Sequence, residues 1–230
     1  MNNISVVLVE PENPGNIGAV ARAMANFSAS KLVLVNPKCS KDDIEGLVRS
    51  KHAYRILQNA KVVKDFSGIN ADYVVGTTSL TGTDYNIPRS PLSPEVFADK
   101  LNGFGKKVAI VFGREGDGLT NDEIAKCDFI VTIPTSLGYK AMNLSHSVAV
   151  ILYEIFKKSG EKKTGRHIVF ASGVDKKVLL NAVYRVLDRL EFSTKEKKET
   201  QKILWKRAVG KAMLTRREMF AMIGFFKKLL

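Results

Sequence analysis

Short runs rich in valine and isoleucine alternate with longer amphipathic stretches through the first 156 residues. Turn-forming residues bound each apolar run, and such unbroken hydrophobicity is typical of strands buried on both faces. Strands of this kind separated by helices predict a mostly parallel α/β sheet. The expected strands are Ile4–Val9, Lys31–Val35, Lys61–Lys64, Tyr73–Gly76, Val108–Phe112 and Phe129–Ile133. The expected helices are Ile17–Phe27, Asp42–Gln58, Pro94–Leu101, Asp122–Lys126 and Leu144–Phe156.

Three loops that contain glycine follow expected strands, at the carboxyl ends where parallel sheets bind ligands. The first, residues 11–22, enters a helix near Asn16, which we expect to be its N-cap, and exposed N–H groups at a helix start favour anions. An ordinary capped helix start explains this loop equally well. The second loop spans residues 112–119, and the third spans residues 133–143, where Asn143 is expected to cap the next helix.

The glycine spacing argues against two common nucleotide sites. The second loop has the spacing GxxGxG, whereas a dinucleotide fingerprint has GxGxxG and an acidic residue further on. This disfavours a nucleotide-dependent dehydrogenase. Gly160 and Gly165 have the gap of a Walker A loop, but Arg166 and His167 follow where the motif needs Lys and Ser or Thr.

The net charge of +13 lies entirely in the last third of the chain. Residues 1–156 carry 16 basic and 16 acidic side chains, whereas residues 157–230 carry 20 and 7. This asymmetry favours a nucleic acid partner, and the alternative is a solvated basic face. We expect a catalytic or cofactor domain at 1–157, a charged linker at 158–170 and a small helical basic domain at 171–230.

Two regions are candidate RNA contacts. Lys195, Lys198, Lys202 and Lys206 recur at helical spacing on one side of an expected helix, where they would follow a phosphate backbone or form an ordinary charged surface. Arg89 lies between two prolines in a polar loop and is a candidate phosphate contact, with an ordinary surface loop as the alternative.

The remaining composition excludes several classes of protein. Cys39 and Cys127 are far apart, and the three histidines have no metal-ligand spacing, so neither a disulfide framework nor a metal site is indicated. No apolar run reaches the roughly 18 residues of a membrane span, and the first residues lack a secretory pattern. We therefore expect a cytoplasmic protein without a membrane or metal partner.

Together the three loops resemble the SPOUT superfamily of methyltransferases, and they closely resemble its TrmJ-type tRNA 2′-O-methyltransferases. The likeness rests on the motifs NIGAVARAMANF (Asn16–Phe27), VFGREGDGLTNDEI (Val111–Ile124) and IPTSLGYKAMNLSHSVAV (Ile133–Val150). It covers about two thirds of the chain. Any one of these loops would be a weak signal, but the three in this order are specific.

The resemblance implies a parallel α/β sheet whose C-terminal part forms a deep trefoil knot, an exception to the rule against knotted chains. It also implies a homodimer whose active sites borrow residues from the partner subunit. S-adenosylmethionine would lie bent in the knot, and Glu115 and Asn143 would shape the site together with Asn16. The implied cofactor-binding residues are Thr77, Thr78, Ser79, Gly113, Ile133, Lys140, Ala141 and Met142.

Arg22 is the residue that matches the family's catalytic arginine. An arginine pKa above ~12 makes this side chain a poor base, so we expect it to orient the hydroxyl and stabilise the developing alkoxide. One departure is Ala141, where the family commonly has serine, which removes a hydroxyl from the site. Since Arg22, Glu115 and Asn143 are present, the sequence favours an active enzyme with altered detail.

The expected function is S-adenosylmethionine-dependent 2′-O-methylation of tRNA, with cytidine 32 of the anticodon loop as the target that the resemblance implies. Methylation of ribosomal RNA is the alternative within the same superfamily, because the related branch shares all three loops. A non-catalytic RNA-binding scaffold is the alternative from another class of protein. Cofactor affinity separates the scaffold from the enzymes.

Overall fold

The computed structural model describes residues 1–79, 91–158 and 168–230. Within them, six parallel strands form one sheet in the order β3-β2-β1-β5-β4-β6. The expected parallel α/β architecture is therefore confirmed. The central strand β5 is buried along its whole length, which explains its unbroken apolar sequence. The strands are β1 (Ile4–Val9), β2 (Lys31–Val35), β3 (Lys61–Val63), β4 (Tyr73–Thr77), β5 (Val108–Phe112) and β6 (Phe129–Val131).

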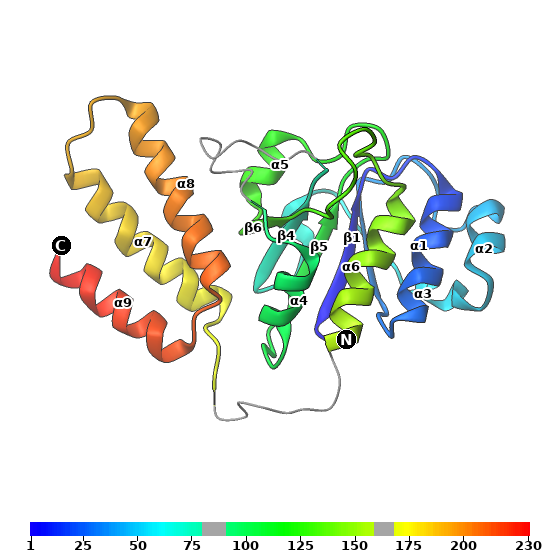
Figure 1. The fold of residues 1–230 in the computed structure, drawn as a ribbon, viewed down its shortest axis with the longest axis horizontal. Coiled ribbons are helices and arrows are strands. Elements are labelled where there is room, and N and C mark those ends of the chain that lie inside the picture. The colour runs from blue at the N-terminus through cyan, green and yellow to red at the C-terminus, as the bar shows by residue number, and fades with distance from the viewer. Residues whose placement is uncertain (80–90, 159–167) are drawn as a thin grey trace.

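Helices cover both faces of the sheet. Over one face, α6 (Leu144–Lys158) packs between α1 (Pro14–Asn26) and α4 (Pro94–Leu101), as Figure 1 shows. On the other face, Ile124 of α5 (Asn121–Lys126) packs with Val7 and Val111. The shorter elements are α2 (Ile44–Ser50), α3 (Tyr54–Gln58) and two 3₁₀ turns at Lys51–Ala53 and Phe66–Gly68.

The prediction of a single helix over Asp42–Gln58 is wrong, because the structure has two short helices there with a 3₁₀ turn between them. The helix α2 ends at Ser50, and Lys51 adopts a φ of 52°, in the left-handed region. Since a right-handed helix cannot continue through that conformation, the chain makes a 3₁₀ turn before α3 begins. The apolar spacing is similar on both sides of the turn, so periodicity does not reveal the break.

The chain returns from the edge of the sheet to its middle after β6. Although β6 is an edge strand, the next helix, α6, packs against α1 and α4. Residues 132–143 therefore cross back over the carboxyl ends of the neighbouring strands. The segment before α4 is fixed to β6 at Leu92, whose N–H donates to Ile130 O and whose carbonyl accepts from Thr132 N, both at 2.9 Å.

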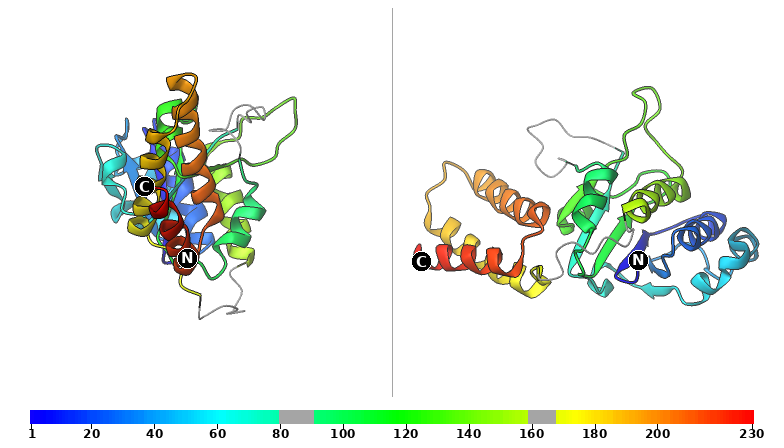
Figure 2. Two further views of the ribbon diagram at one scale, coloured as in Figure 1. Left: turned by 90° about the vertical axis from the view of Figure 1, so that its left-hand side faces the viewer. Right: turned by 60° about the horizontal axis from the view of Figure 1, so that its bottom comes forward.

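Three C-terminal helices pack around an apolar cluster of their own, which includes Leu179, Val183, Met219 and Phe226. In Figure 1 and in the right-hand view of Figure 2 they form a group beside the sheet. The helix α9 begins with the capping box that the sequence indicates, between Thr215 and Glu218. The bounds are α7 (Gly173–Arg189), α8 (Lys195–Ala212) and α9 (Arg216–Lys228). Domain boundaries at 157 and 171 stay predictions.

A buried ion pair joins these helices to the sheet. Lys176 Nζ of α7 lies 2.7 Å from Oδ1 of Asp128, a residue of the turn between α5 and β6. Both side chains are less than a tenth exposed. The same ammonium donates to Asp72 O at 2.9 Å and lies over the ring of Tyr73.

Among the helices of the described ranges, none is long and apolar enough to cross a membrane.

Candidate active site

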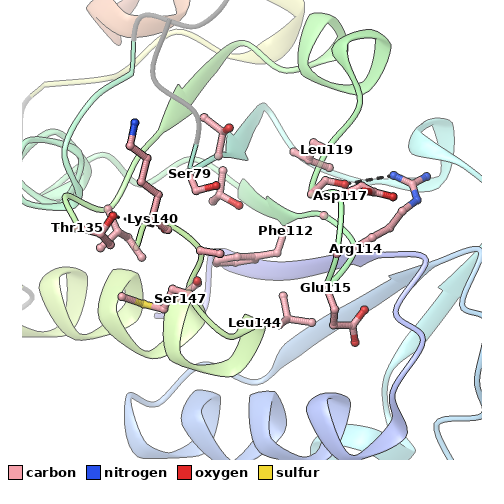
Figure 3. Close-up of a pocket in the computed structure, with 18 of the residues that line it drawn as sticks. Ser79, Phe112, Arg114, Glu115, Asp117, Leu119, Thr135, Lys140, Leu144 and Ser147 are labelled. Carbon is pink, nitrogen blue, oxygen red and sulfur yellow. Dashed lines mark hydrogen bonds between the residues drawn. The ribbon is translucent and has the colours of Figure 1, made fainter. Parts of the chain in front are cut away.

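A cavity of about 260 Å³ opens at the carboxyl ends of β4, β5 and β6. Figure 3 shows side chains from three separate loops that line it. All eight residues expected to bind the cofactor are among them: Thr77, Thr78, Ser79, Gly113, Ile133, Lys140, Ala141 and Met142. The structure thus brings these residues together from three parts of the chain, and their role as ligands stays a prediction.

The second loop folds back on itself so closely that Gly113 has no room for a side chain. A Cβ atom at Gly113 would lie 2.0 Å from the carbonyl carbon of Gly118. Two backbone hydrogen bonds between Arg114 and Gly118 close the turn at 3.1 and 3.2 Å, and Gly118 takes a φ of 69°. This turn presents three glycines to the cavity together with the side chains of Glu115, Asp117 and Leu119.

Hydrogen bonds join the three loops through Glu115, Asn16 and Asn143. The carboxylate of Glu115 accepts from Asn16 Nδ2 at 3.1 Å and from the backbone N–H groups of Glu12 and Asn13 at 3.2 and 3.3 Å. Asn143 Nδ2 then donates to Asn16 Oδ1 at 3.1 Å. Three residues from different loops therefore form one connected network beside the cavity.

The helix caps differ in part from the expectation. Asn13, and not Asn16, caps α1, because its Oδ1 accepts from Asn16 N and Pro14 opens the helix. Asn16 is thereby left to use its side chain between Glu115 and Asn143. The expected cap at Asn143 is confirmed, since its Oδ1 accepts from Ser145 N at 2.9 Å.

Arg114, which also lines the cavity, anchors the second loop to two carboxylates. Its guanidinium makes two hydrogen bonds of 3.0 Å to Glu123 and one of 2.8 Å to Glu10. Hydrogen bonding to Arg114 lowers the pKa of Glu10. Burial raises the pKa of Glu123, but hydrogen bonds from Arg114 and Thr120 outweigh it, so that the net pKa is lowered. Both carboxylates therefore stay ionised at neutral pH.

Arg22 does not line the cavity of its own subunit. It is exposed on α1, and within the described ranges it makes no hydrogen bond or ion pair. Further along the chain, Phe27 at the C-cap of α1 packs edge-on against Tyr153 and at a tilt against Phe156 of α6, with ring centroids 6.0 Å apart in both pairs. Tyr153 and Phe156 are 49% and 44% exposed. Arg22 thus lies close in sequence to an exposed aromatic surface.

Three of the four lysines expected to contact RNA face other parts of the protein. Lys198 and Lys202 lie 3.3 and 3.5 Å from Asp188 of α7, and Lys206 donates to Ala125 O at 2.6 Å. Lys195 is exposed. Their role in RNA binding stays a prediction, and Arg89 lies outside the described residues.

Sequence reasoning missed several residues at the cavity. The acidic Asp117 and the hydroxyl of Ser147 line it, as do Leu144 and Ile151 of α6. Their sequence signal was weak, because a loop acid and apolar helix positions look the same in any α/β protein. In the described part of the chain, no group of three His, Cys, Asp or Glu side chains could hold a metal ion.

Comparison with known proteins identifies the class to which this site belongs. The model of the SpoU rRNA methylase family matches residues 3–153. A tRNA (cytidine-2′-O-)-methyltransferase TrmJ of Methanocaldococcus jannaschii is 41% identical over 227 residues, which cover 97% of this chain and 98% of the relative. The solved structure of TrmJ from Z. mobilis ZM4 superimposes with a TM-score of 0.71 at 26% identity and covers 98% of both chains.

A more distant structure shares the fold. The SpoU methyltransferase AviRb from Streptomyces viridochromogenes, solved with AdoMet, has a TM-score of 0.53 at 20% identity and covers 68% of this chain and 61% of its own. The parallel sheet and the three-loop cavity define an RNA methyltransferase of the SPOUT class. Within that class, the chain belongs to the SpoU rRNA methylase family.

Proposed function

We propose that this protein transfers a methyl group from S-adenosylmethionine to a ribose 2′-hydroxyl of tRNA, at cytidine 32 of the anticodon loop. The observation that carries the proposal is the convergence of three loops on one cavity in a chain that is 41% identical, nearly end to end, to a tRNA (cytidine-2′-O-)-methyltransferase. The base and its position rest on the family resemblance.

The cavity fits S-adenosylmethionine in the chemistry of its lining. Leu119, Ile133 and Leu144 give the cavity apolar side chains that would suit an adenine ring, and Thr77 and Asp117 give it polar atoms that would suit the polar parts of the cofactor. Gly113 lines the cavity with backbone alone, because the backbone of Gly118 occupies the place where a side chain would begin. When bound, S-adenosylmethionine supplies an electrophilic methyl group on a positively charged sulfur.

The residues of the chain orient the acceptor hydroxyl and assist loss of its proton. Arg22 is the candidate for this work, as a cation that binds the hydroxyl or an adjacent phosphate and stabilises negative charge on the oxygen. Asn16, Glu115 and Asn143 hold the three loops in fixed relation, so that the acceptor and the donor meet in one orientation.

The position of Arg22 supports a homodimer in which each site is completed by its partner. Arg22 lies outside the cavity of its own subunit, and five residues further along the chain Phe27 packs with the exposed rings of Tyr153 and Phe156. Such a surface is suited to isologous packing against a second copy. We also assign the trefoil knot to residues 132–143 and the segment at Leu92, because the chain crosses back there after β6.

Substrate choice is tested by incubating the protein with labelled S-adenosylmethionine and either tRNA transcripts or ribosomal RNA. We expect label in tRNA, at a linkage that resists nuclease because its 2′-oxygen is methylated. Label in ribosomal RNA alone would favour the alternative that the family name indicates. Absence of cofactor binding would favour a scaffold. A cytoplasmic location stays a prediction.

Arg114→Gln is expected to weaken binding of S-adenosylmethionine about tenfold. The substitution removes three charge-assisted hydrogen bonds that fix the second loop to Glu10 and Glu123. Equilibrium dialysis with labelled cofactor measures the effect. The matched control is Arg49→Gln, because the ion pair of Arg49 within the described ranges is with Glu45 on the exposed surface of α2. Equal affinities of the two variants would contradict this role of Arg114.

A further inference from the structure

The helix α8 reaches from the C-terminal group to the end of α5. Lys206 Nζ donates to Ala125 O at 2.6 Å, and Arg207 Nη2 donates to Ile124 O at 3.2 Å. These carbonyls belong to the last turn of α5, where cations are favourable and backbone oxygens lack partners within the helix itself, although Ile124 O also accepts from Cys127 N at 3.1 Å. Two consecutive basic residues of α8 therefore hold the end of α5.

The other half of α5 holds the cofactor loop. Glu123 belongs to the capping box at the start of α5, and its carboxylate binds the guanidinium of Arg114 through two hydrogen bonds of 3.0 Å. Arg114 in turn closes the turn with Gly118 that shapes the cavity wall. Since α5 has only six residues, a shift at its last carbonyls moves Glu123 as well.

Packing around this contact leaves little freedom for α8. A Cβ atom at Gly210 would lie 2.8 Å from Asp128 O, so the helix backbone lies directly against the turn after α5. Arg207 is 3% exposed, and its Nη1 has no hydrogen-bond partner among the described residues. A buried guanidinium with one unmatched nitrogen contributes little net stability. The hydrogen bond from Arg207 Nη2 to Ile124 O nevertheless holds α5 in position against α8.

We infer that Lys206 and Arg207 are positioning residues for the cofactor loop at 113–119 and act through α5, Glu123 and Arg114. The C-terminal helices then support the cofactor loop from outside the cavity, in addition to carrying the candidate RNA surface. The inference rests on the proposed function for the identity of the cofactor. Neither residue lines the cavity, so the effect on the cofactor is indirect.

Lys206→Gln tests the inference in the full-length protein without RNA. We expect its Kd for S-adenosylmethionine to rise about fivefold, because the loop loses part of its support. Hydrogen exchange at residues 113–119 should become faster, while exchange in the central strand β5 stays unchanged. Lys206→Arg keeps a cation at this place and should restore most of the affinity. The matched control is Lys197→Gln, because Lys197 is on the same helix and, among the described residues, its ammonium donates to the neighbouring Ser193 Oγ.

A double-mutant cycle tests whether the effect passes through α5. If Lys206 acts through Glu123, the variant Lys206→Gln combined with Glu123→Gln should weaken cofactor binding by less than the product of the two separate factors. Unchanged affinity and exchange in Lys206→Gln would overturn the inference. A wild-type protein that binds no S-adenosylmethionine would overturn the proposed function instead, and hydrogen exchange at 113–119 would still decide whether Lys206 positions the loop.

Discussion

Arg22→Ala is expected to lower kcat for methyl transfer about 10²- to 10³-fold, while the Kd for S-adenosylmethionine stays within about twofold of the wild-type value. Loss of one group that stabilises developing negative charge typically has an effect of this size. Cofactor affinity is spared because Arg22 is exposed on α1 and does not line the cavity of its subunit. Single-turnover transfer and equilibrium dialysis measure the two quantities.

The conservative variant and mixed dimers define how Arg22 acts. Arg22→Lys keeps the charge but loses the planar guanidinium, so we expect intermediate activity.

Gly113→Val should abolish cofactor binding, since even a Cβ atom does not fit there. If Arg22 serves the partner's cavity, mixtures of Arg22→Ala and Gly113→Val should regain activity that neither variant has alone. Full kcat in Arg22→Ala would contradict a catalytic role.

Lys176→Met is expected to lower the free energy of unfolding by about 3–5 kcal/mol, because it leaves the Asp128 carboxylate buried without its cation. The variant also lacks the hydrogen bond that Lys176 donates to Asp72 O and the contact of its ammonium with the Tyr73 ring. The buried pair joins α7 to the sheet, so the loss should uncouple the C-terminal helices first. Urea unfolding followed by circular dichroism measures the change.

Two further variants separate the unpaired charge from ordinary packing. Lys177→Met removes the same charge from the exposed neighbouring position and should change stability by no more than about 0.5 kcal/mol. In Lys176→Met/Asp128→Asn, the amide can still accept from Val74 N, as Asp128 does at 2.8 Å, and no buried charge is left unpaired. Much of the stability should therefore return. Equal stabilities of Lys176→Met and Lys177→Met would contradict the importance of this pair.

The strands were predictable because a strand buried on both faces has a continuous run of apolar residues. All six lie where the apolar runs predict them: three have the expected bounds, and the other three end within two residues of them. The break between α2 and α3 left no such mark, since it depends on the backbone conformation of Lys51. The passage of residues 132–143 back across the sheet depends on tertiary packing of α6, which no local pattern reports.

The site was predictable only as far as the motifs extend. The cofactor residues were placed by resemblance, and the structure gathers them around one cavity. Arg114 was missed because a salt-bridged arginine has no local signature, and its partners lie at Glu10 and Glu123. The lysine stripe of α8 had the spacing of a phosphate surface, but the same spacing serves contacts to Asp188 and to Ala125 O.

The most direct measurement compares two tRNA transcripts that differ only at nucleotide 32. One carries cytidine there, and the other carries 2′-deoxycytidine, which has no hydroxyl to accept the methyl group. With labelled S-adenosylmethionine, we predict that label enters the cytidine transcript, that the linkage after nucleotide 32 becomes resistant to nuclease, and that the deoxy transcript stays unlabelled. Equal labelling of both transcripts would contradict 2′-O-methylation at this nucleotide.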